Sequence, residues 1–143
     1  MPQHTETQHS VTTVATEMML ISDPTLPVVD AELRYRCDDP FAVHMLLSVD
    51  QSPAISWVFG RELLINGVAM PSGFGDVQVY PTHDGVIIEL RSGGVVARLL
   101  AHTPDVMDFT DRTLQLVSLG AEMDHYNLEV DLTCTPVHDS FEA

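Results

Sequence analysis

Residues 29–36 read Val-Asp-Ala-Glu-Leu-Arg-Tyr-Arg, and this stretch decides the fold class. Apolar side chains stand at every second position, so they share one face of an extended chain while the charged side chains share the other. A strand with one buried face and one wet face is typical of an antiparallel sheet that packs on a core. Residues 41–49 and 55–59 repeat the alternation after Asp-Pro and Ser-Pro turns. These segments predict an antiparallel meander of short strands.

The same reading extends to both sides of these segments. Four more apolar or β-branched runs are expected to form strands: residues 11–21, 77–80, 86–91 and 95–101. Gly93 and Gly94 lie between the last two runs and predict a two-residue hairpin turn, because glycine adopts positive φ without steric cost. Residues 61–64 are too short for a core helix, so they are interpreted as a turn or a single helical loop.

A helix is expected after the last strand. Thr103 supplies a cap, Pro104 the first helical position and Asp105 a first-turn acid. One apolar stripe follows at helical spacing, made of Val106, Phe109, Thr113 and Val117. Gly120 fits the left-handed position that ends a helix. Six or seven strands followed by C-terminal helices make an α+β domain.

The segment 123–135 fits two structures. Tyr126, Leu128, Val130 and Leu132 alternate with polar residues, which favours a strand, whereas the spacing of Leu128 and Leu132 also suits a helix. Both interpretations stay open on the residues alone.

Composition and length narrow the classes of protein. The chain has 143 residues, enough for one domain, which we place at residues 11–135 between a flexible lead-in (1–10) and a tail (136–143). Its 21 acids face only 6 bases, all arginines, for a net charge of −15. Such a body repels nucleic-acid phosphates and anionic membrane surfaces, so neither partner is expected. No apolar run approaches the ~18 residues that cross a bilayer.

The two cysteines, Cys37 and Cys134, lie far apart and form no CxxC motif. The first positive charge is Arg34, so the N-terminus lacks the basic region of a secretory signal. We therefore expect reduced, buried thiols and a cytoplasmic protein.

Candidate chemistry is sparse in the sequence. Residues 73–76, Gly-Phe-Gly-Asp, are not followed by the lysine that a P-loop requires, and the chain has no lysine. None of the seven histidines falls in a metal-binding HxxxH spacing, and His83-Asp84 and His138-Asp139 are dyads without a third partner. We expect no catalysis, no cofactor and no metal.

Five pieces of the sequence, in order, resemble the SsgA-like proteins, regulators of sporulation-associated cell division in actinomycetes. They are residues 29–35; residues 39–43; Trp-Val-Phe-Gly-Arg-Glu-Leu-Leu at 57–64; Gly67, Pro71, Gly73 and Gly75-Asp76-Val77; and Phe109, Arg112-Thr113 and Leu-Gly-Ala-Glu at 119–122. No single piece is diagnostic, but their order over most of the chain makes a specific match.

The resemblance implies a non-enzymatic role. Members of the family help to select the division site, and the type that this chain is most similar to recruits the tubulin-like GTPase FtsZ to future septa. The family fold resembles the Whirly single-stranded nucleic-acid binders and forms a small homo-oligomer, a trimer. The expected partners are thus FtsZ and other SsgA-like or septum proteins. Binding of single-stranded nucleic acid by a Whirly-like sheet is the alternative function.

The resemblance also implies a helix after Glu122, although Val130, Thr133 and Pro136 depart from that pattern. Any partner contact that needs a full-length C-terminal helix is therefore in question.

Five residues are candidates for partner binding: Gly120, Arg61, Glu62, Arg112 and Trp57. Each also has a structural interpretation. Arg61 and Glu62 can form an ion pair that closes a loop, Arg112 can bond a carbonyl or a neighbouring acid, and Trp57 can be a core residue. At Gly120 a positive φ would make any side chain unfavourable by about 1 kcal/mol and would redirect the segment that follows.

Overall fold

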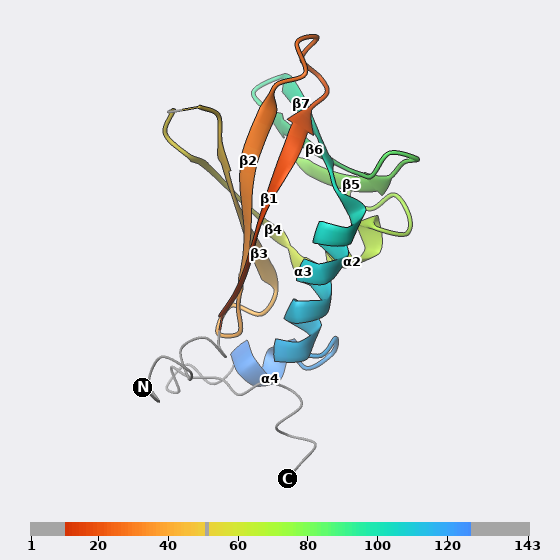
Figure 1. The fold of residues 1–143 in the computed structure, drawn as a ribbon. Coiled ribbons are helices and arrows are strands. Elements are labelled where there is room, and N and C mark those ends of the chain that lie inside the picture. Colours follow the sequence, from red (N-terminus) through yellow and green to blue (C-terminus); the bar gives the residue numbers. More distant parts are fainter. Residues whose placement is uncertain (1–10, 51, 127–143) are drawn as a thin grey trace.

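The structure is a computed structural model that describes residues 11–50 and 52–126. Seven strands form one antiparallel sheet, as the alternating pattern predicts, in the order β4-β3-β2-β1-β7-β6-β5 (Figure 1). The strands are β1 (Val11–Leu20), β2 (Val28–Arg36), β3 (Ala42–Ser48), β4 (Ile55–Gly60), β5 (Val77–Pro81), β6 (Val86–Ser92) and β7 (Val95–Ala101). The helices are α2 (Arg61–Gly67), α3 (Thr103–Leu116) and α4 (Glu122–Tyr126). The predicted α+β class is confirmed, while the likeness to Whirly proteins stays a prediction.

The sheet consists of two meanders that meet at a short seam. β1 to β4 pair in chain order, and so do β5 to β7. β1 and β7 join the two meanders through two residue pairs, Met19 with Leu100 and Leu20 with Leu99. Just after β1, the backbone N–H of Ile21 also donates to the carbonyl oxygen of Arg98 at 2.9 Å. The sheet curls about this seam until it is nearly closed, so residues from both meanders face a common interior (Figure 1).

The interior is filled by alternate strand residues and by one side of α3. Val29, Leu33 and Tyr35 of β2 are buried, as their spacing predicts, and they join one core cluster with Val106 and Phe109 of α3. Each such side chain contributes about 1.5–3 kcal/mol when it is fully removed from water. The apolar side of α3 therefore completes the core that lies inside the nearly closed sheet.

The ends of α3 differ from the sequence prediction. The N-cap is His102, without a side-chain capping bond, so Thr103 starts the helix and Pro104 occupies its second position. Proline is tolerated there because N–H groups of the first turn have no helical partner. The helix ends at Leu116, before Gly120, which lies in the turn that leads to α4.

Two other predictions are corrected. Residues 61–64 belong to a true helix, α2, which continues to Gly67 and buries Leu64. This helix is short in sequence but packs on β5, because Gly67 has no side chain to hold the two elements apart.

Cys37 is fully buried after β2 and is disulfide-bonded, so the expectation of a reduced thiol is wrong. The chain's other cysteine, Cys134, lies outside the described residues, as do the predicted lead-in, the tail and most of the segment 123–135. The expectation was based on the absence of a CxxC motif, and a disulfide does not require its two cysteines to be near each other in the sequence.

The close approach of α2 to β5 yields the first prediction. In Gly67→Ala the new Cβ would lie 2.2 Å from Cγ1 of Val79, a distance that forces the helix away from the strand. We expect a loss of about 1–3 kcal/mol in the free energy of unfolding, measured by urea denaturation. Gly75→Ala is the matched control, because nothing lies within 4 Å of the added Cβ. Equal stability of the two variants would contradict the close packing.

Candidate functional site

Arg61 is the most buried of the candidate residues, with 1% of its surface exposed. Its Nη1 donates to two carbonyl oxygens at the end of α3, Thr113 at 3.1 Å and Val117 at 2.6 Å. Its Nη2 donates to Oε2 of Glu122 at 2.7 Å, and the guanidinium lies 5.0 Å from the ring centroid of Tyr35. The positive charge thus sits at the negative end of the α3 dipole and against the face of an aromatic ring.

Glu122 connects this buried charge to the turn after α3. Its Oε1 accepts a hydrogen bond of 2.8 Å from the backbone N–H of Gly120. Burial alone would raise the pKa of the Glu122 carboxyl, but the hydrogen bonds from Arg61 and Gly120 outweigh it and lower the pKa below its usual value. The carboxylate is therefore ionised at neutral pH and holds the turn in place.

Gly120 adopts the left-handed conformation that its position predicts, with a φ of +90°. A Cβ built there would meet nothing within 4 Å, so the constraint is conformational and not one of space. The side chains of Leu119 and Met123 on either side are 50% and 51% exposed. Gly120 thus lies in an exposed apolar turn, which we call the Gly120 turn (residues 119–123), clamped from beneath by Glu122.

The structure brings together two of the five candidates and separates the others. Arg61 and Gly120 meet through Glu122, whereas Glu62 is exposed and does not pair with Arg61, so the proposed ion pair between neighbours is wrong. Because Arg61 is buried, it presents no surface to a partner. Arg112 is exposed and bonds Asp108 one helical turn away at 3.1 Å, which is the neighbouring-acid alternative.

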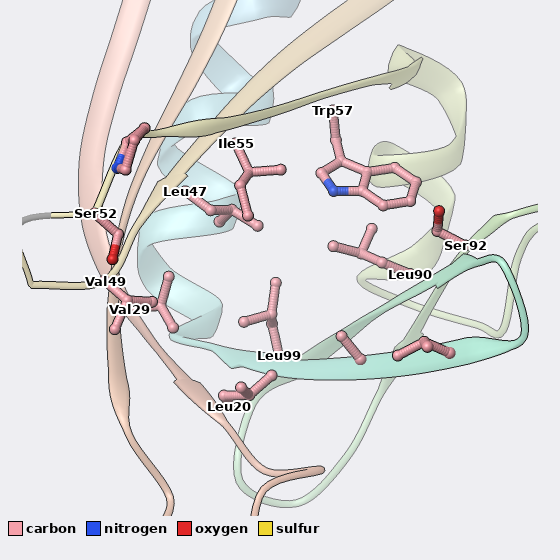
Figure 2. A pocket seen from close by; sticks show the side chains of 13 residues that line it. Leu20, Val29, Leu47, Val49, Ser52, Ile55, Trp57, Leu90, Ser92 and Leu99 are labelled. Carbon is pink, nitrogen blue, oxygen red and sulfur yellow. The ribbon is translucent and has the colours of Figure 1, made fainter.

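Trp57 lies in the wall of an apolar groove of about 500 Å³ between the two meanders (Figure 2). Ile55 and Trp57 of β4 face Leu90 of β6 and Leu99 of β7 across the opening (Figure 2). The groove is lined by uncharged side chains: Leu20, Val29, Leu47, Val49, Ser52, Pro53, Ile55, Trp57, Leu90, Ser92, Val95, Ala97 and Leu99. Trp57 is thus a half-buried residue between core and surface. A groove of this size and lining suits an apolar group.

The arginines are all engaged by acids. Each of the six forms an ion pair with a carboxylate of the described chain. Arg91 and Arg98 share one acid, Glu89, on the outer face of β6 and β7. Glu89 and Glu122 are the two site residues that sequence reasoning missed. Glu89 had a signal, a charge within the apolar run Val-Ile-Ile-Glu-Leu, whereas Glu122 lies 61 positions from Arg61.

The part of the chain that the structure describes has neither a metal-binding cluster nor a membrane-spanning helix. It contains no group of three or more His, Cys, Asp or Glu side chains placed to hold a metal ion. In the same part of the chain, no helix has both the length and the apolar character to cross a membrane.

The seven-stranded antiparallel sheet with its helices is a fold of the SsgA-like type. Residues 29–122 match the family described as Streptomyces sporulation and cell division protein, SsgA. The chain belongs to this family, as the resemblance implied.

Relatives within the family carry a more particular name. Sporulation-specific cell division protein SsgB of Streptomyces coelicolor is 38% identical over 130 residues, which cover 85% of this chain and 94% of that protein. SsgB of Thermobifida fusca is 35% identical over 75% of this chain and 80% of its own. The crystal structure of an SsgA-like sporulation-specific cell division protein from Thermobifida fusca superposes with a TM-score of 0.78 and 32% identity, over 85% of this chain and 92% of that one. These likenesses support a role in sporulation-associated cell division.

The Arg61–Glu122 pair yields the second prediction. Glu122→Gln keeps the shape but removes the charge that balances a buried guanidinium, so we expect a loss of about 1–3 kcal/mol at neutral pH. A carboxyl whose pKa is lowered by folding stabilises the protein above its ordinary pKa of 4.5 and ceases to do so as the pH falls through the folded value. The stability gap between the wild type and the variant should therefore shrink below about pH 4.5.

Urea denaturation at several pH values measures this gap. Glu62→Gln is the matched control, since Glu62 is exposed and is the neighbour of Arg61. It should change stability by less than about 0.5 kcal/mol. A gap for Glu122→Gln that stayed constant down to pH 3 would disprove the assignment.

Proposed function

We propose that the protein is a non-enzymatic regulator of sporulation-associated cell division that marks septum sites and recruits or stabilises the FtsZ machinery through direct contacts. The observation that carries the proposal is the likeness to SsgB of Streptomyces coelicolor, which covers 94% of that protein. The proposal places the protein in the cytoplasm at division septa, as a homo-oligomer that is a trimer and that contacts other SsgA-like or septum proteins.

Two surfaces support a role in protein contacts. The Gly120 turn exposes Leu119 and Met123 on a backbone fixed by Glu122, so an apolar patch is presented in one conformation. The apolar groove exposes Ile55 at 61% and Val95 at 68% at its opening. Exposed apolar residues on a preorganised backbone bind partners at low entropic cost.

The charge distribution weighs against the alternative, a nucleic-acid-binding sheet. The net charge is −15, and each of the six arginines is already paired with an acid. Binding of single strands requires a basic groove and releases counterions, so it weakens steeply with salt. A salt titration with a single-stranded oligonucleotide distinguishes the two functions.

The third prediction tests recruitment directly. The purified protein should pellet with GTP-assembled FtsZ from the same organism at both low and moderate salt, because apolar contacts are insensitive to screening. It should stay in the supernatant when GTP is omitted and FtsZ remains unassembled. Protein that stays in the supernatant with assembled FtsZ at both salts would exclude direct recruitment.

The fourth prediction concerns Gly120. Gly120→Ala should destabilise the domain by only about 1 kcal/mol, because φ is +90° and the added Cβ has open space. It should nevertheless weaken pelleting with FtsZ polymer, since the Gly120 turn would leave its present conformation. Gly94→Ala is the matched control: Gly94 also has a positive φ, +80°, with open space around it, but lies in the β6–β7 hairpin.

Both variants are compared by urea denaturation and by co-sedimentation. Similar stability losses with weaker pelleting only for Gly120→Ala support the Gly120 turn as the docking site. Normal stability and normal pelleting of Gly120→Ala would refute it.

A further inference from the structure

The two edge strands of the sheet, β5 and β4, differ in how they are protected. At the β5 edge, the N–H of Val79 donates to the carbonyl oxygen of Ser72 at 2.9 Å, its own carbonyl accepts from the N–H of Ser72 at 2.8 Å, and Pro81 has no N–H. β4 reads Ile-Ser-Trp-Val-Phe-Gly, with no charged residue, no proline and no bulge in its pairing with β3. Proteins normally protect an edge strand by such devices, because free backbone groups recruit a further strand. The β4 edge is therefore open to pairing.

The register of β4 shows which of its backbone groups are free. The N–H of Arg61 donates to the carbonyl oxygen of Phe41 at 2.7 Å, one step beyond the last residue pair of β3 and β4. In an antiparallel ladder, bonded pairs alternate with non-bonded pairs. Counted back from Arg61, Trp57 directs its N–H and C=O to β3, and its neighbours Ser56 and Val58 direct theirs away from the sheet. Among the described residues, these outward groups have no hydrogen-bond partner.

Open space lies beside this edge, between β4 and the β6–β7 hairpin. Ile55 and Trp57 of β4 point into the apolar groove of about 500 Å³ (Figure 2). A second cavity of about 510 Å³ shares Trp57, Ser92 and Val95 with the groove and continues along the hairpin. Room for an added segment therefore exists next to the free backbone groups.

The walls of this space select an uncharged occupant. No charged side chain lines the apolar groove, and the charged residues in the wall of the second cavity, Asp76 and Arg91, have opposite signs. A charged group that moved into the groove would lose its hydration without gaining a counter-ion. On a protein of net charge −15, these walls therefore match a neutral segment by charge complementarity.

We propose that the free edge of β4 docks an extended, uncharged segment of a partner protein, which adds to the sheet as a further strand. The segment exchanges main-chain hydrogen bonds with Ser56 and Val58, and every second side chain of the segment is apolar and enters the groove. The edge takes such a segment whichever protein carries it, so this docking mode goes beyond the proposed contact with FtsZ.

Two other occupants fit the same space less well. A small apolar molecule would cover the edge without bonding the outward groups of Ser56 and Val58, which is unfavourable. A second folded copy would bring a whole sheet into a space bounded by both β4 and the β6–β7 hairpin. A single added strand needs only about 4.8 Å beside β4.

The fifth prediction uses as its probe a synthetic peptide of alternating Thr and Val, capped at both ends and solubilised by an uncharged polyethylene glycol tail. Trp57 is the single tryptophan of the chain and lines the groove, so its fluorescence reports binding. The emission of Trp57 should shift to the blue as the half-buried indole loses contact with water.

Val58→Pro should weaken peptide binding by about tenfold or more, because it removes an outward N–H and puts a ring at the edge. The fold should tolerate this proline, since the N–H of Val58 is not used by β3. Val58→Thr is the matched control: it keeps the N–H and the β-branched shape, and it should bind within about twofold of the wild type. Urea denaturation checks that both variants fold.

A second pair of probes leaves the protein unchanged. Successive N–H groups of a strand point to opposite sides, so a peptide N-methylated at every Val and one N-methylated at every Thr are blocked on opposite edges. One of the two should bind like the unmodified peptide and the other should not bind. Equal behaviour of the two methylated peptides, no peptide binding by the wild type, or equal binding by folded Val58→Pro and Val58→Thr would overturn the proposed strand addition.

Further readouts identify other occupants and separate the function itself. A blue shift with decanol but not with the peptide would replace the segment by a small apolar molecule. Self-association in sedimentation velocity that Val58→Pro abolishes, without peptide binding, would replace it by a second copy. Co-sedimentation with FtsZ polymer is scored separately. Peptide binding without pelleting contradicts the proposed function and leaves strand addition at β4 standing, and pelleting without peptide binding does the reverse.

Discussion

Arg61 carries a full charge into the interior, and the helical side of the molecule is arranged around it. Removing a guanidinium from water is unfavourable by several kcal/mol unless its hydrogen bonds are replaced. Here two carbonyls at the end of α3 and the carboxylate of Glu122 accept from Nη1 and Nη2, and the guanidinium lies against the face of Tyr35, while the buried Nε has no hydrogen-bond partner among the described residues. These groups come from β2, α3 and α4, and Arg61 itself comes from α2. A shift of any of the four elements would therefore leave the buried guanidinium without some of its partners. The conformation of the Gly120 turn depends on this arrangement, because Glu122 accepts hydrogen bonds from both Arg61 and the backbone N–H of Gly120.

Features with a local cause were predictable from the sequence, and those made by distant residues were not. The alternation in residues 29–36 and the paired glycines 93 and 94 specify a strand and a hairpin on their own. The start of α3 was misplaced by one residue because proline suits either of the first two helical positions. The partner of Arg61 lies 61 positions away, and the sequence offered the adjacent Glu62 instead. The groove could not be predicted from the sequence for the same reason, since its walls come from both meanders.

Each arginine of this protein forms an ion pair within the chain. With 21 acids and 6 arginines, each guanidinium has a carboxylate within reach. The pairs of Arg34, Arg36 and Arg112 are exposed on both sides and contribute little to stability. The buried Arg61 fixes helices, and the half-exposed Arg91 and Arg98 are fixed by a buried acid. The same pairing thus produces a structural clamp where the arginine is inside and a preorganised outer face where the acid is inside.

The short pairing between β1 and β7 divides the sheet into two leaves. A short junction of two residue pairs and the adjacent hydrogen bond from Ile21 to Arg98 connects two leaves of the sheet, and the apolar groove opens where the leaves diverge. Whatever fills the groove touches both leaves at once and opposes their relative rotation. Occupancy and stiffness are then linked quantities, because a ligand that binds the closed arrangement stabilises it by mass action. A partner bound in the groove would therefore stiffen the whole curved sheet, including strands that it does not contact.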